Sequence, residues 1–420
     1  MLYKDTDGTI GHTDASKKNF ERLIEEADNI GLIHSGVDEN VRFAGMIVTW
    51  NVFQHFYPYF HVTNSDWDNQ LRGALENTAN DKSRDDYIDS LLELVEKSGD
   101  GHAHSINLTE KYVKSRGYMP FIADIIEDEV VVTVAESDSG LQLGDIIISK
   151  DGVETSKILE QIKSEVAGSP QWKSFVASER ISAADSVELE ITRDNKIIDV
   201  SVKGFQYLLL DKFNRTEPFK ELDDGIYYFD SNHNVNPTFM LNIETLAEAK
   251  GIIFDMRGYP AVGANWLDII AHLIEKPIKG PISKVMQSIY PNQENVTFME
   301  LQNEIIPSEP IIRGEVVFLS YAGSISHPEY ILGHIKDNGI GEIVGQPTAG
   351  ADGNVRDFSI PGNIVEKFTG LEVLNADGSQ THLIGIEPTV PIERTIEAVR
   401  NGEDEYITKA LELIKSKSSK

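Results

Sequence analysis

The chain has 420 residues, with 38 Lys and Arg against 68 Asp and Glu, which gives a formal net charge of −30 at pH 7. This excess of negative charge argues against a protein that binds the phosphate backbone of nucleic acids or an anionic membrane surface. The chain has no cysteine, which excludes disulfide bonds, thiolate nucleophiles and Cys-ligated metal sites. At about 150 residues per domain, the length predicts two or three domains.

No stretch approaches the roughly 18 consecutive apolar residues of a membrane-spanning helix, so we expect no membrane span. The first residues, Met1-Leu2-Tyr3-Lys4-Asp5, lack the apolar core of a signal peptide. Two expectations stay open at this point: a cytosolic protein, or an exported protein whose leader has been removed.

The first part of the chain has a helical pattern. After a polar lead-in over residues 1–18, apolar residues from Asn19 to about Leu94 recur mostly at spacings of three and four, which is typical of helices packed on a core. We expect the aromatic run 50–60 to lie in that core or at a domain contact. Ser98-Gly99-Asp100-Gly101 is the first strong helix-breaking segment.

Residues 117–202 have the character of strands. A β-branched run at 130–134 is followed by turns at Gly144-Asp145 and Asp151-Gly152. Segments 187–193 and 197–202 alternate apolar and polar residues on either side of Asp194-Asn195, which predicts a β-hairpin. We expect a small β-rich module with one or two helices between residues 156 and 184.

From Phe205 onward, strands and helices are expected to alternate. The apolar pattern predicts buried strands at 251–255, 315–320 and 341–345, helices at 264–274 and about 327–337, and a closing amphipathic helix at 404–416. A βαβ order predicts a mostly parallel sheet, with functional residues beyond the carboxyl ends of its strands.

Ser326 is the strongest single candidate for chemistry. It follows the predicted strand 315–320 across a short loop and directly precedes a helix that begins near His327-Pro328-Glu329. Such a placement points backbone N–H groups and the positive end of the helix dipole at whatever lies beside the hydroxyl, which suits an oxyanion. The alternative is structural, because Ser-x-x-Glu is also the pattern of a helix capping box.

The second candidate is the histidine pair of Gly101-His102-Ala103-His104. Two histidines on a Gly-rich turn are compatible with metal ligands, a catalytic base or exposed loop residues. No His-Glu-x-x-His motif occurs in the chain, which disfavours a metal site. A serine nucleophile needs a base with a pKa near neutral, and histidine is the usual choice.

Two further carboxylates stand in turns. Asp255 and Arg257 follow the predicted strand 251–255 and are interpreted either as a structural ion pair or as part of a site. Glu387, in Gly385-Ile386-Glu387-Pro388, is a carboxylate that could orient a histidine.

Taken in order, these motifs resemble the S41 peptidases, the family of C-terminal processing (tail-specific) and tricorn-core proteases. The resemblance spans about residues 20–415 and rests on segments of this chain that are each similar to one family motif. These segments are Asp100-Gly101-His102, the PDZ-like Gly144-Asp145-Ile146-Ile147 with Asp151-Gly152, the strand 251–260, Ser326-His327-Pro328-Glu329, Gly345-Gln346-Pro347-Thr348-Ala349-Gly350, Gly385-Ile386-Glu387-Pro388, and Asn401-Gly402-Glu403-Asp404.

The resemblance implies a multi-domain α/β fold. Its expected parts are a flexible lead-in (1–18), a helical N-terminal domain that ends in the Asp-Gly-His segment (19–114), a small β-rich PDZ-like domain (115–204) and a catalytic core (205–420). The core is expected to be ClpP/crotonase-like, with a mostly parallel sheet.

The resemblance also implies the site. The processing peptidases carry a lysine base directly after Gly-x-x-Thr-x-Gly, where this chain has Ala351. The likeness is therefore closer to the tricorn-like branch, which implies Ser326 as nucleophile, His102 as general base and Glu387 as the residue that orients His102. Backbone groups of His327, Gly258 and Ala261 are the implied oxyanion and substrate-binding positions.

The function that the resemblance implies is a serine endopeptidase that works through an acyl-enzyme, with no metal or other cofactor. The alternative is a catalytically weakened peptide-binding protein, because Ala261-Val262 replaces the family's glycine pair in a loop that supplies an oxyanion donor. The expected partner is a peptide or unfolded protein, with no nucleic acid, and the sequence does not set the oligomeric state. Family likeness suggests an exported, periplasmic or cell-surface protein with its leader absent from this chain, while a cytoplasmic location stays open.

Overall fold

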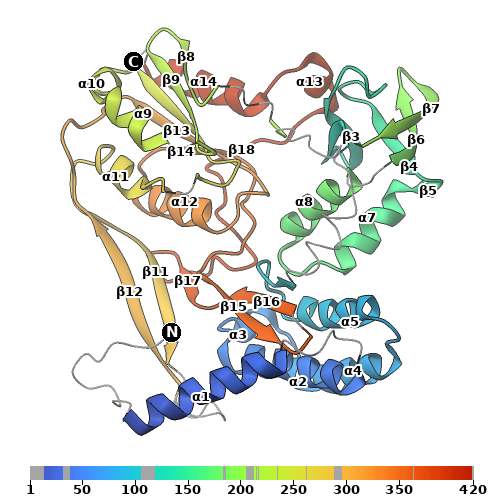
Figure 1. Cartoon of the computed structure of the whole chain (residues 1–420). Helices are drawn as coiled ribbons and strands as arrows, with labels where there is room; N and C mark the ends of the chain where they lie inside the picture. Colours follow the sequence, from blue (N-terminus) through green and yellow to red (C-terminus); the bar gives the residue numbers. More distant parts are fainter. Residues whose placement is uncertain are drawn as a thin grey trace.

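The computed structural model describes residues 14–418 except 32–37, 106–118, 183–185, 205–211, 214, 216, 234, 262, 288–295 and 363. The predicted mixed α/β, multi-domain fold is confirmed: a helical group, a β-rich group and a large sheet flanked by helices occupy three regions of Figure 1. Within the described ranges, no helix has the length and apolar character needed to cross a membrane.

The helical group comprises α1 (Asp14–Gly31), α2 (Glu39–Phe56), α3 (Phe60–Thr63), α4 (Trp67–Asn80) and α5 (Arg84–Glu96). The Asp38 carboxylate caps α2, and Ser83 with Asp86 forms a capping box at the start of α5. The aromatic run lies in the core as predicted, since the side chains of Phe53, Tyr57 and Tyr59 are buried.

Strands from late in the chain complete the core of this helical group. β15 (Val355–Ile360) and β16 (Ile364–Thr369) form an antiparallel sheet with the short β1 (His104–Ser105), in the order β1-β16-β15. Ile360, Ile364 and Phe368 pack into one cluster with residues of α2, α4 and α5. The pairing of β1 with β16 therefore places the end of β16 beside the segment that contains His102.

The β-rich group is a sheet in the order β2-β3-β4-β6-β7, with two helices packed on it. The predicted hairpin of β6 and β7 is confirmed, and both Asp194 and Asn195 at its turn have positive φ, as a two-residue type I′ turn requires. The elements are β2 (Phe121–Ile126), β3 (Glu129–Ala135), β4 (Ile146–Lys150), β5 (Val153–Glu154), α7 (Thr155–Ser164), α8 (Pro170–Ile181), β6 (Ser186–Arg193) and β7 (Lys196–Lys203).

The large sheet has the strand order β18-β14-β13-β10-β9-β8, and every neighbouring pair is parallel except β8 with β9. Its strands are β8 (Phe219–Asp223), β9 (Ile226–Asp230), β10 (Gly251–Asp255), β13 (Glu315–Ser320), β14 (Glu342–Gly345) and β18 (Val390–Pro391). The carboxyl ends of β9, β10, β13 and β14 meet at one edge, where an open α/β sheet carries its functional groups.

Helices cover both faces of this sheet (Figure 1). Side chains of α9, α11 and α12 pack in one hydrophobic cluster with one face, and those of α14 pack with the other. The helices are α9 (Val235–Leu241), α10 (Ile243–Ala247), α11 (Trp266–Ala271), α12 (His327–Asn338), α13 (Ile396–Asn401) and α14 (Glu405–Ser418). A third antiparallel sheet of β12 (Thr297–Ile305), β11 (Ile278–Gln287) and β17 (Glu372–Leu374) has no counterpart in the sequence predictions.

Glu366 on β16 is fully buried, and within the described residues neither carboxylate oxygen has a hydrogen-bond partner. Burial raises its pKa from 4.5 to about 8. The Glu366 carboxyl therefore keeps its proton to a higher pH in the folded chain than in the unfolded chain. The free energy of unfolding should fall as the pH rises from about 4.5 through about 8.

Glu366→Gln, which cannot ionise, should remove this loss. We expect the stability advantage of the variant over wild type to grow by at least about 1.4 kcal/mol between pH 5 and pH 9, as measured by urea unfolding. The matched control is Glu76→Gln on the exposed face of α4. A constant difference across this pH range would contradict the prediction.

Candidate active site

Ser326 stands at the strand-end edge, six residues after β13 and immediately before α12. Its backbone has φ 68° and ψ −113°, a conformation that few residues other than glycine adopt. The side chain is only half-buried. The local sequence thus presents a serine hydroxyl on a strained turn at the N-terminus of a helix.

The carboxylate of Glu329 fixes the conformation of this turn through hydrogen bonds. It accepts the backbone N–H of Ser326 at 2.9 Å, the Thr348 hydroxyl at 2.7 Å, and the N–H groups of Gly350 and Ala351 at 2.7 and 3.1 Å. Burial raises the pKa of Glu329, while these four donors favour its charged form. The Ser-x-x-Glu capping box is therefore present, with the Glu329 carboxylate accepting the Ser326 N–H.

Ala351, where the processing peptidases have their lysine, packs against the histidine segment. A Cβ added to Gly101 would lie 2.9 Å from the Cβ of Ala351, so the Ala351 methyl group lies against the backbone of Gly101. Both residues are buried. The segment that carries His102 thus lies against the loop that Glu329 ties to Ser326.

The His102 side chain is buried, and its ring is held by the C-terminal end of β16. Its Nδ1 lies 2.9 Å from the hydroxyl of Thr369, and that hydroxyl donates to Asp100 Oδ1 at 2.7 Å. The Asp100 carboxylate also accepts the N–H of Thr369 at 2.6 Å and that of His102 at 3.0 Å. Thr369 was not predicted from the sequence.

Glu387 does not occupy the predicted position beside His102. Its side chain is 68% exposed and lies 3.8 Å from Lys336 of α12. In the turn that carries it, Ile386 is the side chain that points into the core. Thr369 is hydrogen-bonded to the His102 ring at Nδ1.

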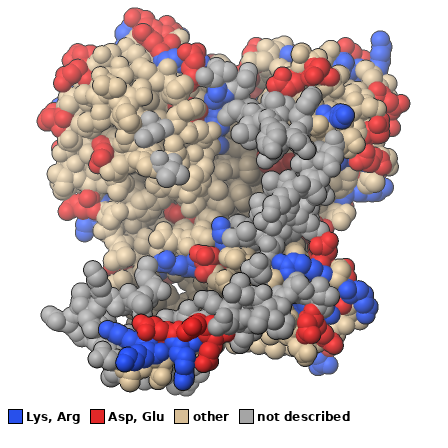
Figure 2. Space-filling model, viewed as in Figure 1, with Lys and Arg blue, Asp and Glu red and all other residues tan. Residues whose placement is uncertain are grey.

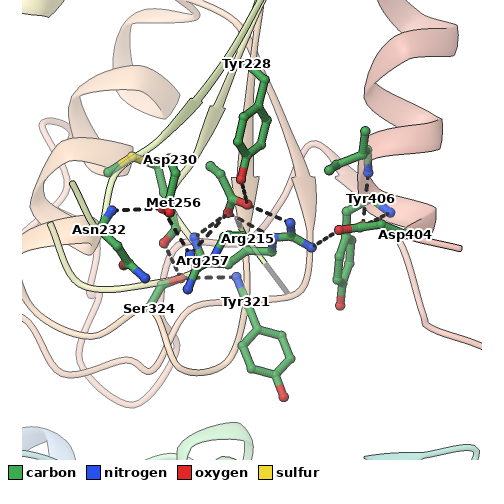
Figure 3. A network of polar contacts seen from close by, with 12 residues as sticks. Arg215, Tyr228, Asp230, Asn232, Met256, Arg257, Tyr321, Ser324, Asp404 and Tyr406 are labelled. Carbon is green, nitrogen blue, oxygen red and sulfur yellow. Dashed lines mark hydrogen bonds and ion pairs between the residues drawn. The ribbon is translucent and has the colours of Figure 1, made fainter. Parts of the chain in front are cut away.

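Asp255 and Arg257 form a buried ion pair beyond the end of β10. Arg257 contacts both Asp255 oxygens, at 2.9 and 2.6 Å. It also reaches Asp404 at 2.8 Å (Figure 3). Burial alone would raise the pKa of Asp255, but the charge and hydrogen bonds of Arg257 outweigh it and hold that pKa below its usual value. This pair fixes the start of the loop that contains Gly258.

Ser324 joins that loop to the turn of Ser326. Its hydroxyl donates to the Met256 carbonyl oxygen at 2.8 Å and accepts the Tyr321 N–H at 3.2 Å (Figure 3). Gly258 sits close against Asn232, where any side chain at position 258 would collide with the asparagine. The backbone of Gly258 is therefore held near the turn of Ser326.

Ala261 does not suit the predicted oxyanion role, because its N–H already donates to the Ser231 carbonyl oxygen at 3.1 Å. Val262 lies outside the described residues. His327 is the first residue of α12, so its N–H has no partner within its own helix. Burial lowers the pKa of the His327 ring, which favours its neutral form.

Helix α8 of the β-rich group braces the same edge. Ser169, its N-cap, donates its hydroxyl proton to the Ala349 carbonyl at 2.6 Å, and the Gln171 amide donates to the Thr348 and Ile384 carbonyls at 2.9 Å each. The ring of Phe175 lies against Gly323, in the loop before Ser326. All three groups of elements therefore contribute to one site.

Two observations concern the metal ions and charged partners that the chain could bind. Within the described ranges, no group of three or more His, Asp or Glu side chains is arranged to hold a metal ion. On the face seen in Figure 2, acidic side chains are spread over each region, and the described Lys and Arg residues gather in no broad patch.

Part of the chain matches a known protein family. Residues 225–392, which contain most of the large sheet and Ser326, match the model of peptidase family S41. The comparison with curated proteins gives no match.

Solved structures share the fold over most of the chain. Mature CPAF is similar with a TM-score of 0.73 at 13% identity, over 90% of this chain and 97% of that one. Its complex with lactacystin gives 0.71 at 14% identity, over 90% and 98%. A candidate peptidase from Parabacteroides merdae gives 0.53 at 15% identity, over 90% and 96%. The α/β core of this chain, residues 225–392, therefore matches peptidase family S41.

Proposed function

We propose that the chain is a serine endopeptidase in which Ser326 is the nucleophile and His102 the general base. The observation that carries the proposal is the packing of two distant segments on one support. Glu329 binds the N–H groups of both Ser326 and Ala351, and Ala351 lies against Gly101, next to His102.

The chemistry follows from the groups available. His102 Nδ1 contacts the Thr369 hydroxyl, and Nε2 is the atom proposed to take the proton from the Ser326 hydroxyl. The serine oxygen attacks the peptide carbonyl, and the resulting oxyanion is stabilised by the His327 N–H at the N-terminus of α12 and by the Gly258 N–H in the adjoining loop. His102 then protonates the departing amine, and water hydrolyses the acyl-enzyme by the same route.

Ala351 supports histidine rather than lysine as the base. The close approach of Ala351 to Gly101 leaves no room for a long side chain in that direction. This contact supports the proposal of a Ser–His pair.

The β-rich region is proposed to be a PDZ-like module that gates the site. Support comes from α8, which contacts the loops around Thr348 and Gly323. An exported or periplasmic location is proposed from the family likeness alone.

Hydrolysis of a mixed library of unstructured peptides, followed by mass spectrometry, tests the function. We expect new peptide termini with wild type and none with Ser326→Ala, and a loss of about 100-fold or more with His102→Ala. Glu387→Gln is the matched control and should cleave like wild type. Peptide binding without cleavage in folded wild type would favour the weakened, peptide-binding alternative.

The backbone strain at Ser326 gives a second prediction. A conformation of this kind costs on the order of 1–3 kcal/mol for a residue with a Cβ, and glycine relieves most of it. Ser326→Gly and Ser326→Ala should both be inactive, but the glycine variant should be more stable by about 1 kcal/mol in urea unfolding. Equal stability of the two variants would show that the turn is unstrained.

A further inference from the structure

The hydrogen bonds that start at His102 Nδ1 lead through Thr369 to the carboxylate of Asp100. No catalytic role was predicted for Asp100 from the sequence. We propose that Asp100 is the acidic residue that assists His102 in catalysis. It acts through the Thr369 hydroxyl, which orients the His102 ring and holds the negative charge of Asp100 one hydroxyl group away from it. The inference rests on the proposed function. It makes Asp100 and Thr369 positioning residues, because neither contacts the reacting atoms.

The donor count sets the direction of each hydrogen bond. Asp100 accepts three bonds, from the N–H of His102, the N–H of Thr369 and the Thr369 hydroxyl, which is the behaviour of an ionised carboxylate. A hydroxyl has a single proton, and Thr369 gives it to Asp100 at 2.7 Å. The oxygen of Thr369 must therefore accept at its 2.9 Å contact with His102 Nδ1.

This fixes the tautomer of the imidazole. Nδ1 carries the proton, and Nε2 keeps the lone pair that a general base requires. When His102 takes the serine proton, the resulting imidazolium is stabilised by the Asp100 charge across one hydroxyl group. In the serine triad of other proteases the carboxylate meets the histidine directly.

The arrangement is rigid because each member belongs to a fixed element. Asp100 and Thr369 are fully buried. Thr369 is the last residue of β16, whose other face packs on the helical core, and the Asp100 N–H donates to Ser98 at 3.2 Å. Second-layer groups held in this way keep a catalytic side chain in its productive geometry.

A second buried histidine, His382, adds no charge beside this relay. His382 is buried, stacks on Tyr59 at 3.9 Å between ring centroids and contacts the Tyr57 hydroxyl at 3.0 Å. Burial lowers its pKa to about 4, so its ring is neutral at the pH of the reaction. Asp100 is the carboxylate hydrogen-bonded to this relay.

Three variants separate a relay from a merely structural threonine. Thr369→Ser keeps the hydroxyl and should retain kcat/KM within about threefold, while the isosteric Thr369→Val should lose about 10- to 100-fold, mainly in kcat. Asp100→Asn should lose about 100-fold or more in kcat/KM. It should also move the acidic limb of the kcat/KM pH profile to lower pH, because the variant lacks the negative charge that stabilises protonated His102 in wild type. Wild-type rates and pH profiles in both Thr369→Val and Asp100→Asn would overturn the relay.

A second measurement needs no turnover. In the full chain labelled with ¹⁵N-histidine, His102→Ala identifies the His102 signals, and their shifts report which ring nitrogen bears the proton. We expect the Nδ1–H form in wild type and in Thr369→Ser, and a mixture or the Nε2–H form in Thr369→Val. An Nε2–H tautomer in wild type would overturn the relay even if Thr369→Val fails to fold. An Nδ1–H tautomer in a wild type that cleaves nothing would support the relay and count against the proposed function.

Discussion

The site depends on one buried carboxylate. Glu329 accepts four hydrogen bonds from Ser326, Thr348, Gly350 and Ala351, which secures the strained turn and the neighbouring loop to the first turn of α12. Leaving such donors without a partner in the interior costs about 1–3 kcal/mol each, so the set holds together as a unit. Because Ala351 lies against Gly101, the same set also locates the histidine segment.

The local parts of this fold could be predicted because their signals are local. Continuous apolar runs marked β10, β13 and β14, a Pro-containing start marked α12, and Asp194-Asn195 marked the hairpin of β6 and β7. The sheet of β11, β12 and β17 was missed. Nearly every residue of β12 is exposed, so its sequence lacks the alternation of apolar and polar residues that indicates a half-buried strand.

The surroundings of the candidate residues could be predicted only where a motif lies next to the residues that hold it in place. Ser326 and His102 follow recognisable turns, but Thr369 reaches His102 through the pairing of β1 with β16, which joins residues more than 260 positions apart. No spacing in the chain announces that contact. Glu387 and Ala261 were transferred by position in a motif. Burial of Ile386 turns Glu387 outward, and the Ser231 carbonyl already takes the Ala261 N–H.

In the proposed mechanism the three groups of elements act together. The helical group and β16 place His102, the large sheet places Ser326, and α8 contacts the loops at Thr348 and Gly323. The most direct test is covalent labelling of the folded chain with a fluorophosphonate, followed by mass-spectrometric mapping of the adduct. The account predicts a single adduct on Ser326, absent from Ser326→Ala and formed far more slowly in His102→Ala. No adduct on folded wild-type protein, or an adduct on another residue, would contradict it.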